Sequence, residues 1–394
     1  RYEFLRDVLL QRRELQGSVS INRVRRKKDG EVVSFIGLVG EKKYTKNGNI
    51  MFSVEDPTGS VRVVVSQAQH DMFSLASDLV LDEVVGVRGV VGGGGLIFCN
   101  SLYYPDIPHV ETKKASSDVY AVFVGDTHFG LKNFVESSFV RFVEWLNGKY
   151  GDERHKEIAK KVRYLFLVGD VVEGVGVYPG QENDLEIKDI YKQYELAARY
   201  LSMIRKDITI IVCGGNHDAL RLAEPQPPLV SRFTEALQEL PNVLLVSNPA
   251  YVNIHSSSDF VGFDVLLYHG FSFVYFAENV DSLRSKGGQT RPESIMEFLL
   301  KKRHLAPTHG SSLYVPDREE DPLLIDKVPD FFVSGHLHRC GVSSYKGVTL
   351  INASCWVTQT EDQERRGIVP DPCKAVAVNL GSREVKILNF GVGE

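Results

Sequence analysis

Five polar segments, each placed where a short apolar run ends, constrain this chain of 394 residues more than any other feature. The apolar runs have the length of buried strands, and the segments that follow them combine glycine with Asp, Asn or His. The segments are Gly125-Asp126-Thr127-His128, Gly169-Asp170, Gly215-Asn216-His217-Asp218, His269-Gly270 and Gly335-His336-Leu337-His338. Because ligands of open α/β sheets bind at the carboxyl ends of strands, we expect these distant segments to converge.

The chain after residue 118 alternates between strand-like and helix-like stretches. Apolar strands are predicted over 119–124, 163–168, 208–213, 264–268 and 331–333. Helices are predicted over about 133–149, 188–205, 229–239 and 292–303, and a closing hairpin over 375–379 and 385–390. This order predicts a layered β-sandwich flanked by helices.

The first part of the chain has a different pattern. A short helix is predicted over 1–15, and valine-rich strands over 32–39, 50–55, 61–66, 83–92 and 95–103. Five short strands separated by turn residues suit a small closed barrel, and the OB-fold is the leading candidate. Pro105 to Asp118 reads as a linker, so we expect an OB-fold domain over 1–113 and an α/β (α+β) domain over 114–394.

Length and composition agree with two soluble globular domains, since 43% of the residues are hydrophobic and 25% are charged. No apolar run approaches the roughly 18–20 residues of a membrane helix, and we expect no signal peptide, no membrane contact and a cytoplasmic location. The chain begins at Arg1 rather than Met, and we expect it to be a fragment. Five cysteines without a Cys-x-x-Cys pair indicate buried thiols in a reducing compartment.

The net charge of −5 is unevenly distributed. Residues 1–114 hold 16 Lys and Arg against 14 Asp and Glu, whereas the remainder holds 30 against 37. An acidic domain binds a polyanion poorly unless bound cations reverse the local sign. The second domain is therefore compatible with a metal site and argues against nucleic-acid binding by charge alone.

The side chains of the five segments are of the kind that holds Mn²⁺, Fe²⁺ or Zn²⁺. Two divalent cations bridged by a carboxylate are a common device for cutting phosphate esters. His217 follows Asn216, so it should face the substrate if Asn216 binds metal, and there it can stabilise the transition state or protonate the leaving oxygen. Asp218 would then orient its imidazole, and a helix beginning near Ala219 could offer N–H groups to an anion.

These motifs resemble those of the calcineurin-like metallophosphoesterase superfamily over about residues 118–394. The resemblance implies a β-sandwich with helices on both outer faces. It also implies that Asp170 bridges two metals and that His217 is the catalytic histidine. The implied ligands of one metal are Asp126, His128, Asp170 and His338, and those of the other are Asp170, Asn216, His269 and His336.

Two departures narrow the substrate class. Protein phosphatases of this superfamily carry Arg-Gly after the second motif and Gly-Asn-His-Glu at the third, whereas here the second reads Gly169-Asp170-Val171-Val172-Glu173-Gly174 and the third ends in Asp218. A barrel ahead of the phosphoesterase domain resembles the small subunits of archaeal family-D DNA polymerases and the B-subunits of eukaryotic replicative polymerases. The eukaryotic B-subunits have lost metal ligands, but this chain retains all of them.

The resemblance implies a proofreading 3′→5′ exonuclease that works with Mn²⁺ on DNA 3′ ends and is partnered by a large catalytic polymerase subunit. Two alternatives remain: a scaffold subunit with little catalysis, and a phosphatase or cyclic-nucleotide phosphodiesterase. Arg284, Lys286 and Arg291 are either DNA-backbone contacts or parts of a solvated loop, and Arg221 is a similar case.

The barrel also has two interpretations. It either guides single-stranded DNA, through the basic stretch 23–28 and Phe35, Tyr44 and Phe52, or forms a docking platform for the large subunit. We favour docking, because a net charge of +2 over residues 1–114 attracts DNA only weakly.

Overall fold

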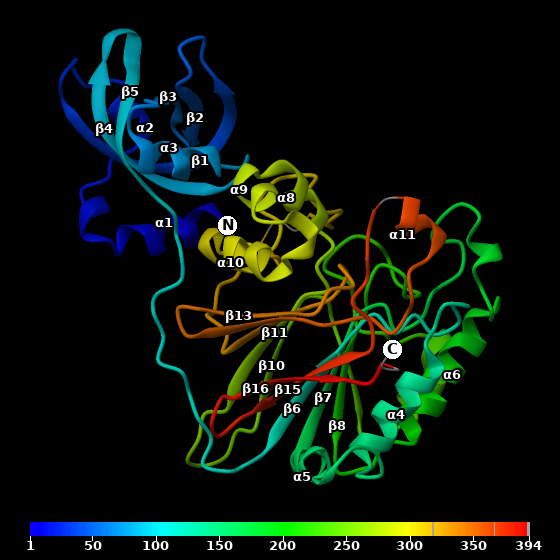
Figure 1. Cartoon of the computed structure of the whole chain (residues 1–394). Helices are drawn as coiled ribbons and strands as arrows, with labels where there is room; N and C mark the ends of the chain where they lie inside the picture. The colour runs from blue at the N-terminus through cyan, green and yellow to red at the C-terminus, as the bar shows by residue number, and fades with distance from the viewer. Residues whose placement is uncertain (317–318, 366, 392–394) are drawn as a thin grey trace.

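An N-terminal barrel precedes a larger sandwich domain in the computed structural model, which describes residues 1–316, 319–365 and 367–391 (Figure 1). The barrel is closed by five strands in the order β1-β2-β3-β5-β4. These are β1 (Val32–Tyr44), β2 (Ile50–Asp56), β3 (Gly59–Val65), β4 (Val84–Gly92) and β5 (Leu96–Tyr103). The predicted OB-fold architecture is therefore confirmed.

Alternating side chains of the barrel strands fill its interior. Phe35 and Phe52 lie in this core, so neither is available to stack on a base, whereas Tyr44 is 55% exposed. Helices α2 (Ile21–Val24) and α3 (His70–Ser77) pack against the strands. The predicted N-terminal helix is shorter than expected, because α1 (Tyr2–Leu10) ends before a separate 3₁₀ turn, η1 (Arg13–Leu15).

Two sheets form the sandwich of the second domain. The six-stranded sheet has the order β16-β15-β6-β7-β8-β9, and the five-stranded sheet the order β10-β11-β12-β14-β13. The first contains β6 (Tyr120–Val124), β7 (Val162–Val168), β8 (Thr209–Cys213), β9 (Val243–Val246), β15 (Lys374–Asn379) and β16 (Val385–Asn389). The second contains β10 (Ala250–Ile254), β11 (Phe263–Leu267), β12 (Phe331–Ser334), β13 (Gly341–Tyr345) and β14 (Val348–Asn352).

The central strands β6, β7, β8, β11 and β12 are mostly apolar and buried because both faces of each sheet are covered. Phe123 of β6 points between the sheets, where it stacks on Phe166 at a ring distance of 4.9 Å. Its neighbours Val122 and Val124 point to the outer face and join the core under the helices. Within each sheet these strands run parallel, β6 with β7 and β8 and β11 with β12, so their carboxyl ends lie at the same edge.

Helices cover both outer faces, as predicted (Figure 1). Helices α4 (Glu136–Leu146), α5 (Glu153–Lys161) and α6 (Ile190–Ser202) lie on the six-stranded sheet, and α8 (Phe273–Asn279), α9 (Asp281–Ser285) and α10 (Pro292–Lys302) on the five-stranded sheet. The helix predicted over 229–239 is mostly a turn: η4 (Arg232–Thr234) leads into the single turn α7 (Glu235–Gln238). No helix begins near Ala219, where the described backbone forms bends, so the anion site expected there is wrong.

The barrel docks on the sandwich through a buried ion pair. Nζ of Lys302, the last residue of α10, lies 2.7 Å from Oε2 of Glu83, and both side chains are 1% exposed. The same ammonium lies 3.4 Å from the ring centre of Tyr104. Asp106 follows Tyr104 and pairs with Lys346 of the sandwich at 2.5 Å. The division of the chain at residue 113 stays a prediction.

The five cysteines are free, and four of them are buried. No helix in the described ranges is both long enough and apolar enough to cross a membrane.

Candidate metal centre

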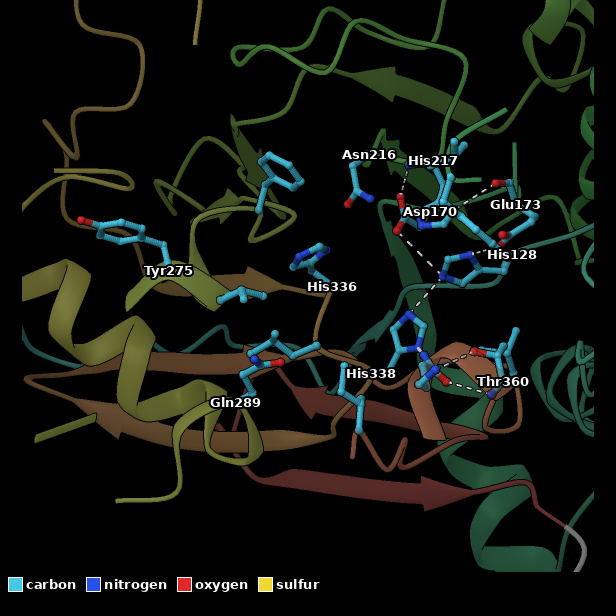
Figure 2. Close-up of a pocket in the computed structure, with 18 of the residues that line it drawn as sticks. His128, Asp170, Glu173, Asn216, His217, Tyr275, Gln289, His336, His338 and Thr360 are labelled. Carbon is cyan, nitrogen blue, oxygen red and sulfur yellow. Dashed lines mark hydrogen bonds and ion pairs between the residues drawn. The ribbon is translucent and has the colours of Figure 1, made fainter. Parts of the chain in front are cut away.

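The carboxyl ends of five strands bring all seven predicted metal ligands to one place, and Figure 2 shows five of them, His128, Asp170, Asn216, His336 and His338. Strands β6, β7 and β8 of one sheet and β11 and β12 of the other each end one or a few residues before a predicted ligand. The site therefore lies where the edges of both sheets meet. The seven residues are Asp126, His128, Asp170, Asn216, His269, His336 and His338.

Asp126, His128 and His338 form one group. Their ligand atoms lie within 4.8 Å of one another. Nε2 of His128 is 3.0 Å from Nε2 of His338, and Nε2 of His338 is 3.5 Å from Oδ1 of Asp126. Three donor atoms thus face a common point, as a metal site requires.

Asp170, His269 and His336 form the second group, within the same 4.8 Å limit. Nε2 of His269 lies 3.2 Å from Oδ2 of Asp170 and 3.1 Å from Oδ1 of Asn216. Oδ2 of Asp170 also lies 3.8 Å from Nε2 of His128, which belongs to the first group. Asp170 is therefore placed to be shared by both groups.

The ligand atoms of the two groups are suited to binding cations. Nδ1 of His128 donates to Oε2 of Glu173 at 2.7 Å, so Nε2 is the ring nitrogen that faces the cluster. Asp126 and Asp170 are buried, yet in the described part of the chain no Lys or Arg pairs with either. Buried carboxylates are unfavourable unless positive charge lies close to them. The site therefore fits two divalent ions.

The backbone at these strand ends is unusual. Asp126, His128, Asp170, His336 and His338 all have left-handed φ values, between 45° and 69°. Residues other than glycine rarely adopt this conformation, and it costs of order 1–3 kcal/mol each. The surrounding fold holds five ligand residues in this conformation, which turns their side chains sharply inward from the strands.

Glycines allow the ligands to be approached closely. A Cβ on Gly215 would fall 2.2 Å from Oδ1 of Asp170, and a Cβ on Gly335 would fall 2.5 Å from Oδ2 of Asp126. Any larger residue at either position would push the carboxylate out of the cluster. The glycines thus make room for the ligand side chains.

His217 lies beside the two groups and is held by Glu173. Its Nδ1 donates to the backbone carbonyl of Glu173 at 2.9 Å and lies 3.5 Å from Oε2 of the same residue. Burial opposes protonation, but the negative charges of Asp170 and Glu173 prevail and raise the pKa of His217 to about 10. Glu173 occupies Nδ1, so Nε2 is the ring nitrogen left to act as a proton donor in the cavity that His217 lines.

Glu173 was not foreseen from the sequence. It is 2% exposed and contacts both His128 and His217, while Gln181 donates to its Oε1 at 2.9 Å. Burial alone would raise the pKa of Glu173, but the two histidines hold it below its ordinary value. The sequence signal that could have identified Glu173 is its position three residues after Asp170.

Asp218 does not orient His217, which corrects our expectation. Its carboxylate accepts hydrogen bonds from the backbone N–H groups of Gly215, Val171 and Val172 and from the hydroxyl of Tyr194. These bonds tie the loop after β7 to the loop after β8. Asp218 therefore fixes the loops rather than the imidazole.

Other neighbours fix the remaining ligand rings. Nδ1 of His269 donates to the carbonyl of Val168 at 3.2 Å, so its Nε2 faces the cluster. Nδ1 of His338 contacts the amide of Gln363 at 2.9 Å, from α11 (Glu361–Arg365). Burial lowers the pKa of His336 to about 3, so this ring is neutral and able to bind a metal.

The cluster forms one wall of a cavity of about 600 Å³. Figure 2 shows His336 and His338 between Tyr275 and Gln289 on one side and Glu173 and His217 on the other. Of the cations considered for DNA binding, Arg284 borders an adjoining hollow and Lys286 a different one beside the barrel. Arg291 pairs with Glu293, and Arg221 donates to the carbonyl of Pro225.

Comparison with known proteins agrees with this fold and site. Residues 120–340 match the family model described as calcineurin-like phosphoesterase, and residues 33–95 match the one described as OB-fold nucleic acid binding domain. The fold and the paired cluster thus define a metal-dependent phosphoesterase with a barrel ahead of it.

Relatives that align with nearly the whole chain identify the family more closely. The "DNA polymerase II small subunit" of Methanothermobacter thermautotrophicus is 39% identical over 99% of this chain and 77% of that protein. The protein of the same description from Pyrococcus furiosus is 38% identical over 99% of this chain and 62% of its own length, and that from Archaeoglobus fulgidus is 39% identical over 91% and 70%. The chain belongs to the family of DNA polymerase II small subunits.

Proposed function

We propose that this chain is a two-metal 3′→5′ exonuclease that removes nucleotides from DNA 3′ ends and proofreads for a replicative DNA polymerase. The observation that carries the proposal is the meeting of all seven candidate ligands in two groups that share Asp170. Membership of a polymerase small-subunit family supports DNA as the substrate. A large catalytic subunit is the proposed partner.

The site residues have three roles: holding one metal, holding the other metal and donating a proton. Asp126, His128, Asp170 and His338 would hold one metal, and Asp170, Asn216, His269 and His336 would hold the other. Two divalent cations, Mn²⁺ in our proposal, with Fe²⁺ or Zn²⁺ as alternatives, would activate the attacking water and offset charge on the phosphate. His217 protonates the leaving oxygen through Nε2, and Glu173 holds the opposite ring nitrogen.

A scaffold function alone does not account for this site. A subunit that only joins proteins has no need of five strained ligand residues around buried carboxylates. A phosphoprotein phosphatase is disfavoured because the segment Gly169–Gly174 lacks the Arg-Gly of that class and the third motif ends in Asp218 rather than Glu. We propose that the barrel is the docking platform for the large subunit, since Phe35 and Phe52 are buried in its core.

The test is release of mononucleotides from oligonucleotides labelled at the 5′ end, with Mn²⁺, by the purified chain alone and with its large subunit. A ladder shortening from the 3′ end supports the proposal. No release in either form overturns it. Turnover of phosphopeptides or cyclic nucleotides in place of DNA would instead assign the site to the phosphatase or cyclic phosphodiesterase class.

A further inference from the structure

The metal cavity continues into a second hollow of about 410 Å³. Four residues border both spaces, so the two form one path along the surface. They are Glu278, Gln289, Leu337 and Ile368. The path leads from the metal ligands, between the segment around α8 and η5 (Gly288–Thr290) and the segment after α11, into the second hollow.

The two spaces differ in charge. None of the described residues that line the metal cavity is Lys or Arg, while Asp170, Glu173 and Glu278 are acidic. The second hollow is bordered by two cations, Arg284 and Arg339, and by one acidic residue, Glu278, which it shares with the metal cavity. A DNA strand carries a negative charge at every phosphate, so the metal cavity can accept a phosphate only at the metals themselves.

Arg339 is the better placed of the two cations. It directly follows the ligand His338, so its backbone position is fixed by the metal site. Arg339 is half-buried, and its guanidinium donates once, from Nη1 to the carbonyl of Val369 at 2.9 Å. It pairs with no carboxylate in the described ranges, which leaves a fork of donors available to an anion.

Arg284 can join it at little cost. It pairs with Asp281 at 2.6 Å, and both side chains are more than half exposed. An ion pair this exposed contributes at most about 1 kcal/mol, so a phosphate can replace the carboxylate.

We propose that the second hollow binds the phosphate upstream of the scissile one on a single DNA strand, with Arg339 as the main contact and Arg284 as the second. This rests on the proposed nuclease function. The terminal nucleotide occupies the metal cavity, and the strand leaves across Leu337. The preferred substrate is therefore a strand with at least one further phosphate, rather than a small isolated diester.

The test compares Arg339→Gln and Arg284→Gln with Arg154→Gln, an exposed Arg on α5 that borders neither space. The substrates are a single-stranded oligonucleotide and bis(p-nitrophenyl) phosphate. We expect the ratio of kcat/KM for the oligonucleotide to that for the small diester to fall about tenfold in Arg339→Gln and not to change in the control. The slope of the logarithm of the oligonucleotide binding constant against the logarithm of the salt concentration should decrease in magnitude by about one.

Binding of a fluorescein-labelled oligonucleotide, followed by anisotropy, separates this inference from the proposed function. If the wild-type chain cleaves nothing, the exonuclease proposal fails, and the binding data alone decide the role of Arg339. If the wild-type chain cleaves DNA while Arg339→Gln retains the wild-type Kd, salt dependence and substrate ratio, the inference is overturned and the exonuclease proposal stands.

Discussion

Glu173 accepts a hydrogen bond from Nδ1 of His128 at 2.7 Å, while its backbone carbonyl accepts one from His217. One buried residue thus orients a metal ligand and the proposed proton donor together. The coupling means that the metal site and the proton donor cannot shift independently.

Glu173→Gln tests this coupling. The amide retains an acceptor but loses the charge that favours Nδ1–H on both rings, so we expect metal affinity or activity to fall about 10- to 100-fold. Isothermal titration with Mn²⁺ and oligonucleotide turnover measure the two effects. Glu182→Gln, on the exposed part of η3 (Gln181–Asn183), is the matched control. Wild-type affinity and turnover in Glu173→Gln would contradict the role.

His217→Ala separates proton donation from metal binding. His217 lies near His128 and Asp170, so the geometry alone also permits it to be a ligand. In our assignment turnover falls about 10²- to 10⁴-fold while the metal content stays at the wild-type level. Elemental analysis after dialysis decides the point, since loss of an ion would make His217 a ligand.

Asp170→Asn and Asp126→Asn should differ in the number of ions lost. Asp170 lies within reach of both groups, whereas Asp126 belongs to the first group only. We expect Asp170→Asn to weaken both ions and Asp126→Asn to weaken one. Metal-to-protein ratios measured over a series of free Mn²⁺ concentrations give the answer, and equal losses in the two variants would refute a bridging role.

Glu224 makes stability depend on pH. It is 1% exposed, and burial raises its pKa from an ordinary 4.5 to about 7, despite hydrogen bonds from Ser312 and Tyr268. Between these values the unfolded chain loses a proton that the folded chain keeps, so this group makes the protein less stable as pH rises from 4.5 to 7. The loss is about 3 kcal/mol at most.

Glu224→Gln removes this titration. The variant should gain stability relative to wild type between pH 5 and pH 8, as measured by urea unfolding at each pH. Glu195→Gln, an exposed site on α6, should show no such gain. A difference between Glu224→Gln and wild type that does not change with pH would be inconsistent with the raised pKa.

Lys302→Met should destabilise the contact between the domains. It leaves the carboxylate of Glu83 buried without its cation, which typically costs about 3–5 kcal/mol. Adding Glu83→Gln should restore most of that loss, because a neutral amide can still accept the hydrogen bond from the N–H of Val80. Urea unfolding of the single and double variants measures the recovery, and its absence would mean that the cost arises from packing alone.

The sequence predicted the strands and the cluster because polarity changes abruptly where the strands end. The run Val119–Val124 becomes polar at Asp126, and the ligands of the other strand ends follow the same rule. Strand ends of a covered sheet meet at one edge, so their order along the chain was enough to predict convergence.

Contacts between loops could not be predicted from the sequence pattern. Asp218 directly follows His217 but faces the opposite way, toward Tyr194, while Glu173 reaches His217 from another strand end. From the sequence, Lys302 at the end of an amphipathic helix is expected to be solvated. It is buried only because the barrel docks against it. Such contacts depend on tertiary geometry that adjacency in sequence does not encode.

The buried pair of Lys302 and Glu83 fixes the barrel to the C-terminal end of α10. Separating two charges inside a dry interior is unfavourable, so displacing the barrel at this contact is costly. Helix α10 spans 11 residues, about 16 Å, from Lys302 back to Pro292, and η5 at the rim of the proposed strand path lies just before it. One helix therefore connects the seat of the barrel with the rim of the proposed substrate path.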